Sequence, residues 1–137
     1  MSKRRVLMVC TGNTCRSPLA EVLLRKLRPE WEVRSAGVMA GVGPASKNSL
    51  AVAAQRGLNL NEHRSQRVSQ PLLDWADEVI CMTEGHRQVL QQSYPDSQAK
   101  TLGREISDPV GQSLAVYQRC ADQIEAALQD WLSQSDQ

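Results

Sequence analysis

Short apolar runs alternate along the chain with longer amphipathic stretches. The first run, Arg5–Val9, is rich in β-forming residues and has no polar face, which predicts a strand buried on both sides. The stretch after it predicts a helix, with Ser17 as its N-cap, Pro18 at its first position and Pro29 ending it. Its apolar stripe consists of Leu19, Leu23, Leu24 and Leu27.

The same alternation continues to the end of the chain. Three further strands are predicted at Trp31–Ala36, Glu78–Met82 and Ala99–Leu102. Three further helices are predicted at Pro44–Arg56, Pro71–Ala76 and Glu84–Ser93. The polar stretch Asn59–Gln70 predicts irregular structure. A long C-terminal helix is indicated by apolar residues three or four apart, which are Val116, Cys120, Ile124, Leu128 and Trp131.

Strands that alternate with helices predict an α/β fold of three layers, in which helices cover both faces of a parallel sheet. With 137 residues and no internal repeat or linker, we expect one domain that spans residues 1–137. Parallel sheets bind ligands at the carboxyl ends of their strands. The most unusual residues of the chain directly follow the first strand, at that edge.

Composition narrows the classes of protein to consider. Apolar residues make up 41% and charged residues 23%, and the net charge of +1 predicts no general attraction to nucleic acid or to a membrane. No apolar run is long enough to span a bilayer, and Val6–Cys10 is too short for the core of a signal peptide. We therefore expect a cytoplasmic protein. Its cysteines should then be reactive or buried thiols rather than disulfides, and they are Cys10, Cys15, Cys81 and Cys120.

The segment VCTGNTCRSP at Val9–Pro18 joins the first strand to the first helix. Backbone N–H groups in such a loop, together with the positive end of the helix dipole, form an anion site. Gly12 and Asn13 are the residue types that best tolerate left-handed backbone, which lets successive amides converge on one centre. Arg16 can bind two phosphate oxygens with its planar guanidinium. The loop therefore predicts a phosphate site.

Cys10 is expected beneath the bound anion, where the same positive field stabilises its thiolate and makes it a nucleophile for phosphoryl transfer. Two other interpretations compete: an ordinary strand–helix turn in which Cys10 is a buried strand end, and a metal site in which Cys10 and Cys15 are ligands. However, no second close Cys/His pair completes a zinc set, and no Gly-Lys-Ser/Thr makes the loop a nucleotide-binding one. The ordered combination of strand, Cys, Gly-Asn, Arg-Ser-Pro and helix favours catalysis.

These motifs resemble the low-molecular-weight protein tyrosine phosphatase family. The matching segments are VCTGNTCRSPLAE at Val9–Glu21, RSAG at Arg34–Gly37, His63-Arg64, VICMT at Val79–Thr83, and Asp108-Pro109. The resemblance implies a four-stranded parallel sheet with helices on both faces. It further implies a cysteine-dependent phosphatase of phosphorylated proteins that works through a phosphocysteine and needs neither a metal nor a cofactor.

The resemblance also assigns roles to single residues. It makes Cys10, Arg16 and Asp108 the catalytic set, with Asp108 first protonating the leaving group and then activating water; without the resemblance, Asp-Pro would be taken for a common turn. It makes Ser17 the hydroxyl that stabilises the departing Cys10 thiolate. The phosphate-binding loop consists of Thr11, Gly12, Asn13, Thr14, Cys15, Arg16 and Ser17.

Residues outside this core of the site receive supporting or structural roles. Asn13, Ser35 and His63 match polar residues that brace the loop in this family. Cys15 matches a second loop cysteine that can form a reversible disulfide with Cys10, although a plain packing role is an equal alternative. Cys81 and Cys120 are predicted to be core residues, and His86, on a predicted helix, is expected at the surface.

Two sequence features bear on the substrate. Tyrosine-directed members of the family follow their Asp-Pro with aromatic residues, whereas here Val110 and Gly111 follow and the chain contains no Phe. Thr11 stands where those members usually carry an aliphatic residue, which resembles the protein arginine phosphatase branch. We therefore favour phosphoarginine over phosphotyrosine. Arsenate reduction through Cys81 is a less favoured alternative, because no second cysteine follows it closely, and a non-catalytic phosphate-binding module is another.

Overall fold

The computed structural model describes residues 3–135. Its four parallel strands form one sheet in the order β2-β1-β3-β4. The strands are β1 (Arg5–Cys10), β2 (Glu32–Gly37), β3 (Glu78–Cys81) and β4 (Lys100–Thr101). The helices are α1 (Arg16–Leu27), α2 (Lys47–Gln55), α3 (Gln70–Trp75), α4 (Glu84–Ser93) and α5 (Leu114–Ser135). The predicted α/β fold with a four-stranded parallel sheet is confirmed.

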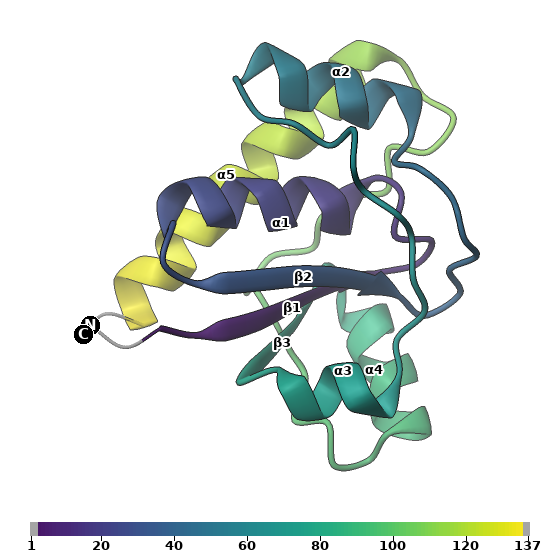
Figure 1. The fold of residues 1–137 in the computed structure, drawn as a ribbon, viewed down its shortest axis with the longest axis vertical. Coiled ribbons are helices and arrows are strands. Elements are labelled where there is room, and N and C mark those ends of the chain that lie inside the picture. Colours follow the sequence, from purple (N-terminus) through teal and green to yellow (C-terminus); the bar gives the residue numbers. More distant parts are fainter. Residues whose placement is uncertain (1–2, 136–137) are drawn as a thin grey trace.

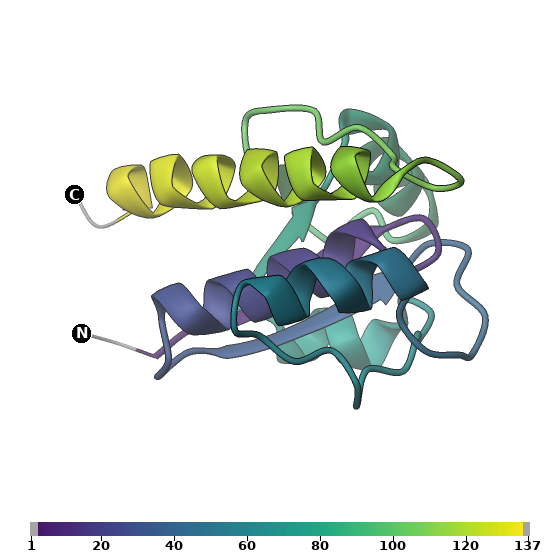
Figure 2. The same ribbon diagram turned by 90° about the horizontal axis from the view of Figure 1, so that it is seen from above.

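Helices cover both faces of the sheet (Figure 1). The long helices α1 and α5 lie side by side on one face, with α2 packed against them, whereas α3 and α4 lie on the other (Figures 1 and 2). The central strand β1 is buried on both sides: Val6 and Met8 belong to the core beneath α1 and α5, and Leu7 and Val9 to the core above α3 and α4. This two-sided burial is why β1 carries an unbroken apolar run.

Most element boundaries agree with the sequence predictions within three residues, and one capping assignment is wrong. Helix α1 begins at Arg16, its N-cap is Cys15, and the Ser17 side chain does not cap it. Ser17 lies inside the first turn, where its hydroxyl is committed to the loop described below. Pro18 is therefore the third helical residue, still within the first turn, where a missing N–H breaks no helical hydrogen bond.

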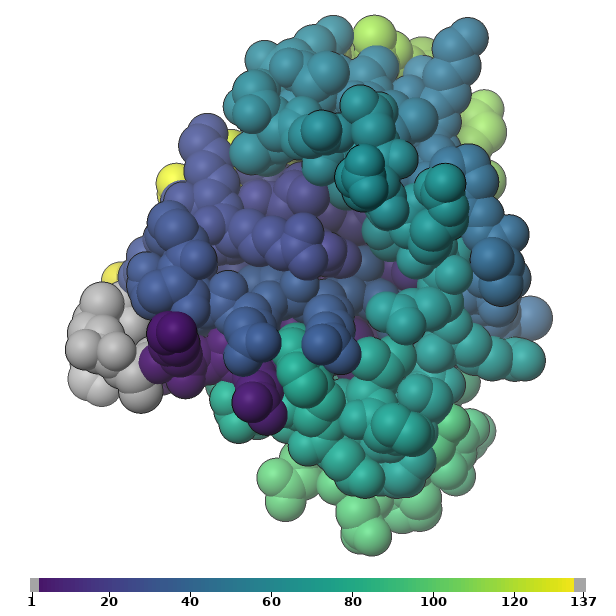
Figure 3. All heavy atoms as spheres, in the orientation of Figure 1, coloured from purple at the N-terminus to yellow at the C-terminus, as the bar shows by residue number. Residues whose placement is uncertain are grey.

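The segment between α2 and α3 crosses in front of β2 (Figures 1 and 3). It is irregular, as predicted, yet it is tied to the carboxyl end of that edge strand: Gly37 N donates to Gln66 O at 2.9 Å, and Val68 N donates to Gly37 O at 3.0 Å. The segment thus pairs backbone groups at the carboxyl end of this edge that would otherwise be unpaired. No helix within residues 3–135 has the length and apolar character needed to cross a membrane.

The strand order decides where the loops converge. From β1 the chain crosses to β2 on one side and then returns past β1 to β3 on the other, so the sheet changes its winding direction between β1 and β3. Ligands bind at such switch points in open parallel sheets. The loops that follow β1, β3 and β4 all begin at the carboxyl edge of the sheet.

Candidate active site

The loop after β1 forms the floor and one wall of a pocket of about 230 Å³. Its lining residues are Cys10, Thr11, Gly12, Thr14, Cys15, Arg16, Asp108 and Val110. Asn13 has a left-handed backbone with φ of 57°, as expected. Gly12 does not adopt a positive φ, which corrects the expectation that both residues would. The single left-handed residue is sufficient to turn the chain from strand to helix.

Arg16 is buried and fixed in this pocket. Its Nη1 donates to the carbonyl of Ile106 at 2.9 Å, and its Nη2 lies 3.3 Å from Thr11 Oγ1 and 3.6 Å from Asp108 Oδ2. Its Nε is buried and has no hydrogen-bond partner among residues 3–135. A guanidinium held in this way keeps an N–H group available for an oxyanion that enters the pocket.

A directed chain of hydrogen bonds leads from Glu21 to Cys10. Ser35 Oγ donates its proton to Glu21 Oε1 at 2.5 Å. Because that proton is used, Ser35 Oγ is an acceptor for one Asn13 Nδ2 hydrogen, at 2.9 Å. The other Nδ2 hydrogen goes to Ser17 Oγ at 2.8 Å. The Ser17 proton then has two acceptors within reach, the Cys10 sulfur at 2.9 Å and the Ala36 carbonyl oxygen at 3.5 Å, of which the sulfur is the nearer. An O–H group at this distance can donate a hydrogen bond to the sulfur.

The backbone of Asn13 is held from the segment between α2 and α3. His63 Nε2 lies 2.7 Å from the Asn13 carbonyl, Ser65 Oγ donates to the same carbonyl at 3.0 Å, and Gln66 N donates to Asn13 Oδ1 at 3.0 Å. The structure therefore brings the predicted residues Ser35 and His63 to Asn13. Sequence reasoning missed Glu21, Ser65 and Gln66. For Ser65 and Gln66, their closeness in sequence to His63 was the available signal.

Gly37, at the end of β2, leaves no room for a side chain. A Cβ atom there would lie 2.4 Å from the Thr11 carbonyl oxygen and 2.9 Å from the Asn13 nitrogen. The backbone approach is held by Val38 N and Met39 N, which donate to the carbonyls of Cys10 and Thr11 at 2.9 Å each. The close approach of two backbones gives a physical reason for glycine in the segment RSAG.

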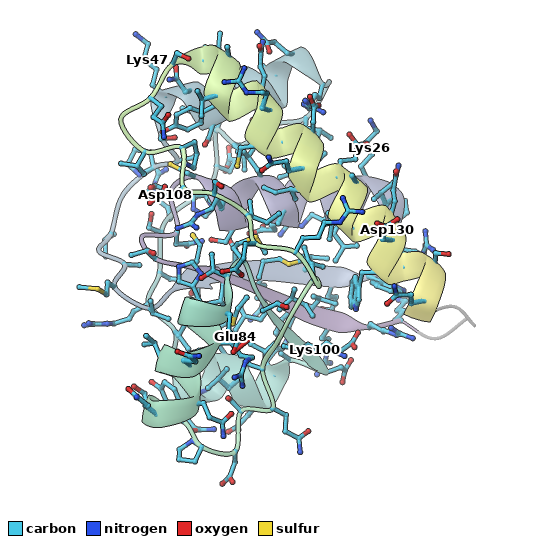
Figure 4. The ribbon with its side chains drawn as sticks, turned by 180° about the vertical axis from the view of Figure 1, so that it is seen from behind. Lys26, Lys47, Glu84, Lys100, Asp108 and Asp130 are labelled. Carbon is cyan, nitrogen blue, oxygen red and sulfur yellow. The ribbon has the colours of Figure 1, made fainter. Side chains whose placement is uncertain are left out.

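Asp108 lies on the loop between β4 and α5, beside the amino end of α1 (Figure 4). Its side chain is 49% exposed and lines the pocket, so its carboxylate is accessible both to solvent and to a bound ligand. Its Oδ1 also accepts the backbone N–H of Val110 at 3.1 Å, which is the local turn that an Asp-Pro pair favours. The turn therefore presents the carboxylate to the pocket.

His86 is buried, so its predicted surface position is wrong. Only 7% of the residue is exposed, its Nε2 lies 2.8 Å from Thr11 Oγ1, and its Nδ1 lies 3.0 Å from Thr83 Oγ1. Burial, and secondly the charge of Arg16, lower its pKa from 6.5 to about 4, so the ring is neutral at pH 7. The available signal was the four-residue spacing to Leu90, which places both residues on the buried face of α4.

Cys15 is buried beside the pocket, and its sulfur has polar neighbours. Its Sγ lies 3.4 Å from Ser46 Oγ and 3.4 Å from the Tyr117 hydroxyl. Burial, together with the hydrogen bond to Cys15, raises the pKa of Tyr117 to about 12. All four cysteines, Cys10 and Cys15 included, are free thiols in this structure.

The two remaining cysteines lie in the core, as predicted. Cys81 pairs in register with Val9 and belongs to the core above α3 and α4, whereas Cys10 faces the core beneath α1 and α5. Burial raises the pKa of Cys81 to about 12 and that of Cys120 to about 11, so both remain thiols at pH 7. A disulfide relay from Cys10 to Cys81 would have to cross the sheet, which argues against arsenate reduction by that route.

Among residues 3–135, no aromatic side chain lines the pocket. Tyr117 lies behind the loop against Cys15, and Tyr94, whose hydroxyl lies 3.4 Å from the Val68 carbonyl, packs on the other face of the sheet. Within residues 3–135, no group of three or more His, Cys, Asp or Glu side chains is arranged to hold a metal ion.

Comparison with known proteins agrees with this geometry. A family model described as "Low molecular weight phosphotyrosine protein phosphatase" matches residues 5–137. A protein-arginine-phosphatase of Geobacillus stearothermophilus is 38% identical over 135 residues, which cover 90% of each chain. A probable low molecular weight protein-tyrosine-phosphatase, EpsP of Ralstonia nicotianae, is 34% identical over 139 residues, which cover 94% of each chain.

A solved structure is also similar to this chain over nearly its whole length. It is a cysteine-to-serine variant of the arginine phosphatase YwlE whose active-site serine is phosphorylated. It superposes with a TM-score of 0.89 at 30% identity, and the match covers 96% of this chain and 94% of that one. The chain therefore belongs to the low molecular weight phosphotyrosine protein phosphatase family.

Proposed function

We propose that the chain dephosphorylates proteins through a phosphocysteine formed on Cys10. The observation that carries the proposal is the position of the Cys10 sulfur, 2.9 Å from the Ser17 hydroxyl and in the same pocket as Arg16 and Asp108. A thiolate, an anion-binding guanidinium and an accessible carboxyl group are the three groups that phosphoryl transfer to cysteine requires.

In the first step, the Arg16 guanidinium and the loop amides bind the phosphoryl oxygens. The Cys10 thiolate attacks phosphorus, and the bond between phosphorus and the leaving atom of the substrate breaks. Asp108, in its protonated form, gives its proton to that leaving atom. Phosphocysteine and the dephosphorylated residue are the products of this step.

In the second step, Asp108 takes a proton from water while the water oxygen attacks phosphorus. The P–S bond breaks, inorganic phosphate forms, and the Cys10 thiolate is regenerated. The Ser17 hydroxyl stabilises this leaving group, since the Cys10 sulfur is the nearer acceptor of its proton. The similar YwlE structure, in which a serine that replaces cysteine in the active site is phosphorylated, supports a phosphoenzyme intermediate.

Variants of Cys10 and Asp108 test this mechanism. Cys10→Ser is expected to lose hydrolysis but to keep binding inorganic phosphate in calorimetry, because the loop amides and Arg16 remain. Asp108→Asn is expected to lower kcat by about two to three orders of magnitude, with Asp96→Asn, an exposed carboxylate outside the pocket, as the matched control. Substantial hydrolysis by Cys10→Ser would exclude the phosphocysteine route.

The preferred substrate that we propose is phosphoarginine. Thr11 places a hydroxyl oxygen in the pocket, and the lining residues include no aromatic ring to stack on a phenyl group. The similarity to the Geobacillus arginine phosphatase supports the same assignment, whereas the similarity to tyrosine phosphatases makes phosphotyrosine the alternative to test.

The test compares kcat/KM on two peptides of the same sequence, one with phosphoarginine and one with phosphotyrosine. The wild type is expected to prefer phosphoarginine. Thr11→Ile is expected to shift the preference towards phosphotyrosine, because it exchanges a polar oxygen for apolar surface. A wild type that prefers phosphotyrosine, with no change in Thr11→Ile, would overturn the arginine assignment.

A further inference from the structure

Three side chains, from the loop after β1 and from the start of α4, form a hydrogen-bond chain that ends at Thr11 in the pocket. Thr83 Oγ1 lies 3.0 Å from His86 Nδ1, and His86 Nε2 lies 2.8 Å from Thr11 Oγ1. Thr83 Oγ1 is fixed in turn, because it caps α4 by accepting the backbone N–H of His86 at 3.1 Å. The neutral imidazole therefore controls in which direction the Thr11 hydroxyl points its proton.

The proton count around Thr11 allows two arrangements. Arg16 Nη2, at 3.3 Å, is a donor only and takes one lone pair of Thr11 Oγ1. If His86 Nε2 carries the ring proton, it takes the second lone pair and the Thr11 proton must point into the pocket. If Nδ1 carries the proton, Nε2 accepts the Thr11 proton, and the second lone pair of Thr11 faces the pocket.

The proposed substrate decides between these arrangements. A phosphorylated guanidinium presents N–H donors on its nitrogen atoms, so a Thr11 proton aimed at it would place two donors face to face. An open lone pair on Thr11 Oγ1 would instead accept one of those N–H groups. The Nδ1–H of His86 then donates to Thr83 Oγ1, which can accept both this proton and the backbone N–H of His86.

We propose that His86 is a positioning residue, which takes the Thr11 hydroxyl proton at Nε2 and leaves Thr11 Oγ1 as an acceptor for the guanidinium of phosphoarginine. The inference rests on the proposed arginine specificity and adds to it the residue that orients the specificity group. Burial of the ring supports it, because the lowered pKa keeps Nε2 free of a second proton at pH 7.

Nitrogen NMR of the unliganded protein tests the arrangement without any substrate. The chain has two histidines, so His86→Gln assigns the His86 ring signals. At pH 7 we expect a proton on Nδ1 and none on Nε2. Thr11→Val, which removes the hydroxyl at nearly constant volume, should shift the Nε2 signal. A proton found on Nε2, or an unchanged Nε2 signal in Thr11→Val, would overturn the proposal.

Kinetics on the matched peptides tests the consequence. His86→Leu is expected to lower kcat/KM for the phosphoarginine peptide about tenfold, the effect of one oriented hydrogen bond, and to change phosphotyrosine turnover by less than about twofold. His86→Gln should retain most of the arginine activity, because its amide oxygen can accept the same proton. Gln92→Leu, an exposed position on the same helix, is the matched control.

A double-mutant cycle separates positioning from general support of the loop. If His86 acts through the Thr11 hydroxyl, adding His86→Leu to Thr11→Val should cause no further loss. Equal losses on both peptides, or additive losses in the cycle, would overturn this proposal while the arginine assignment stands. A wild type that prefers phosphotyrosine would overturn both. If His86→Leu fails to fold by circular dichroism, the NMR comparison of wild type and Thr11→Val still decides.

Discussion

The polar side chains around Cys10 are buried, and each orients the next. Asn13 uses both amide hydrogens and its amide oxygen within the protein, so it cannot rotate without breaking three hydrogen bonds. Ser17 consequently keeps one proton to donate, with the Cys10 sulfur as its nearer acceptor and the Ala36 carbonyl oxygen as the other. At the scale of single residues, the site therefore depends on where individual protons point, which a substitution can test.

Ser17→Ala should slow catalysis without unfolding the protein. It removes the hydroxyl donor to the Cys10 sulfur, and hydrogen bonds to charged groups contribute about 1.5–3 kcal/mol. We expect kcat to fall by about one to two orders of magnitude. Ser133→Ala, an exposed serine on α5, is the control and should retain wild-type turnover. Wild-type kcat in Ser17→Ala would show that this hydroxyl does not stabilise the leaving thiolate.

Gly37→Ala, at the end of β2, should displace the phosphate-binding loop that packs against it. The added methyl group would meet the Thr11 carbonyl oxygen at 2.4 Å, so either the loop or the end of β2 must move. We expect a loss of about 1–3 kcal/mol in the free energy of unfolding and weaker binding of inorganic phosphate in calorimetry. Gly41→Ala lies in the adjoining loop with nothing within 4 Å of its new Cβ, and it should leave both quantities unchanged.

At the scale of elements, side chains at the N-termini of helices contact residues of the active site. Within residues 3–135, four helices begin with a hydroxyl N-cap: Ser46 for α2, Ser69 for α3, Thr83 for α4 and Ser113 for α5. Two of these caps also reach the site, since Ser46 contacts Cys15 and Thr83 contacts His86. Ser69 caps its helix and makes no such contact with the rest of residues 3–135. Comparing substitutions of Ser46 and Ser69 therefore distinguishes the effect of losing an N-cap from the effect of losing a contact with the loop.

Ser46→Ala and Ser69→Ala should each lower the free energy of unfolding in urea by about 1 kcal/mol, the usual effect of losing an N-cap. Only Ser46→Ala should also speed the alkylation of Cys15 by iodoacetamide, followed by mass spectrometry, because the Cys15 sulfur loses a polar neighbour at 3.4 Å. Equal Cys15 reactivity in the two variants would mean that Ser46 acts as a cap alone.

At the scale of the whole molecule, burial of a neutral histidine makes stability depend on pH. In the unfolded chain His86 takes up a proton near its ordinary pKa of 6.5, whereas in the folded protein it does so only near pH 4. Between these values the unfolded state binds more protons, so stability falls as the pH is lowered. Arg16 adds to the effect, while the carboxylates of Asp108 and Glu105 oppose it.

The wild type should therefore lose more stability than His86→Gln between pH 7 and pH 4.5, by at most roughly 3 kcal/mol. Urea unfolding at both pH values measures the four free energies, and their double difference removes the contribution of the carboxylates common to both proteins. Parallel losses in the two proteins would show that His86 is protonated equally in the folded and unfolded states.

The sequence by itself determined the order and type of the elements and the composition of the loop. Strand β1 was evident because burial on both faces requires an unbroken apolar run, and α5 because one buried face requires apolar residues every three or four positions. The loop was evident because Cys10, Asn13, Arg16 and Ser17 are contiguous. Local patterns of this kind reflect local constraints, which a sequence records directly.

Only the tertiary structure decided which distant residues meet at the loop. His86 and Leu90 share one face of α4, yet periodicity does not reveal that this face meets Thr11, because the contact depends on how the strands are ordered in the sheet. Ser17 illustrates the same point. Its sequence position favours an N-cap, but in the folded chain its hydroxyl is hydrogen-bonded to Asn13 and Cys10 instead. Hydrogen-bond partners far apart in sequence are set by packing, and only the folded chain brings them together.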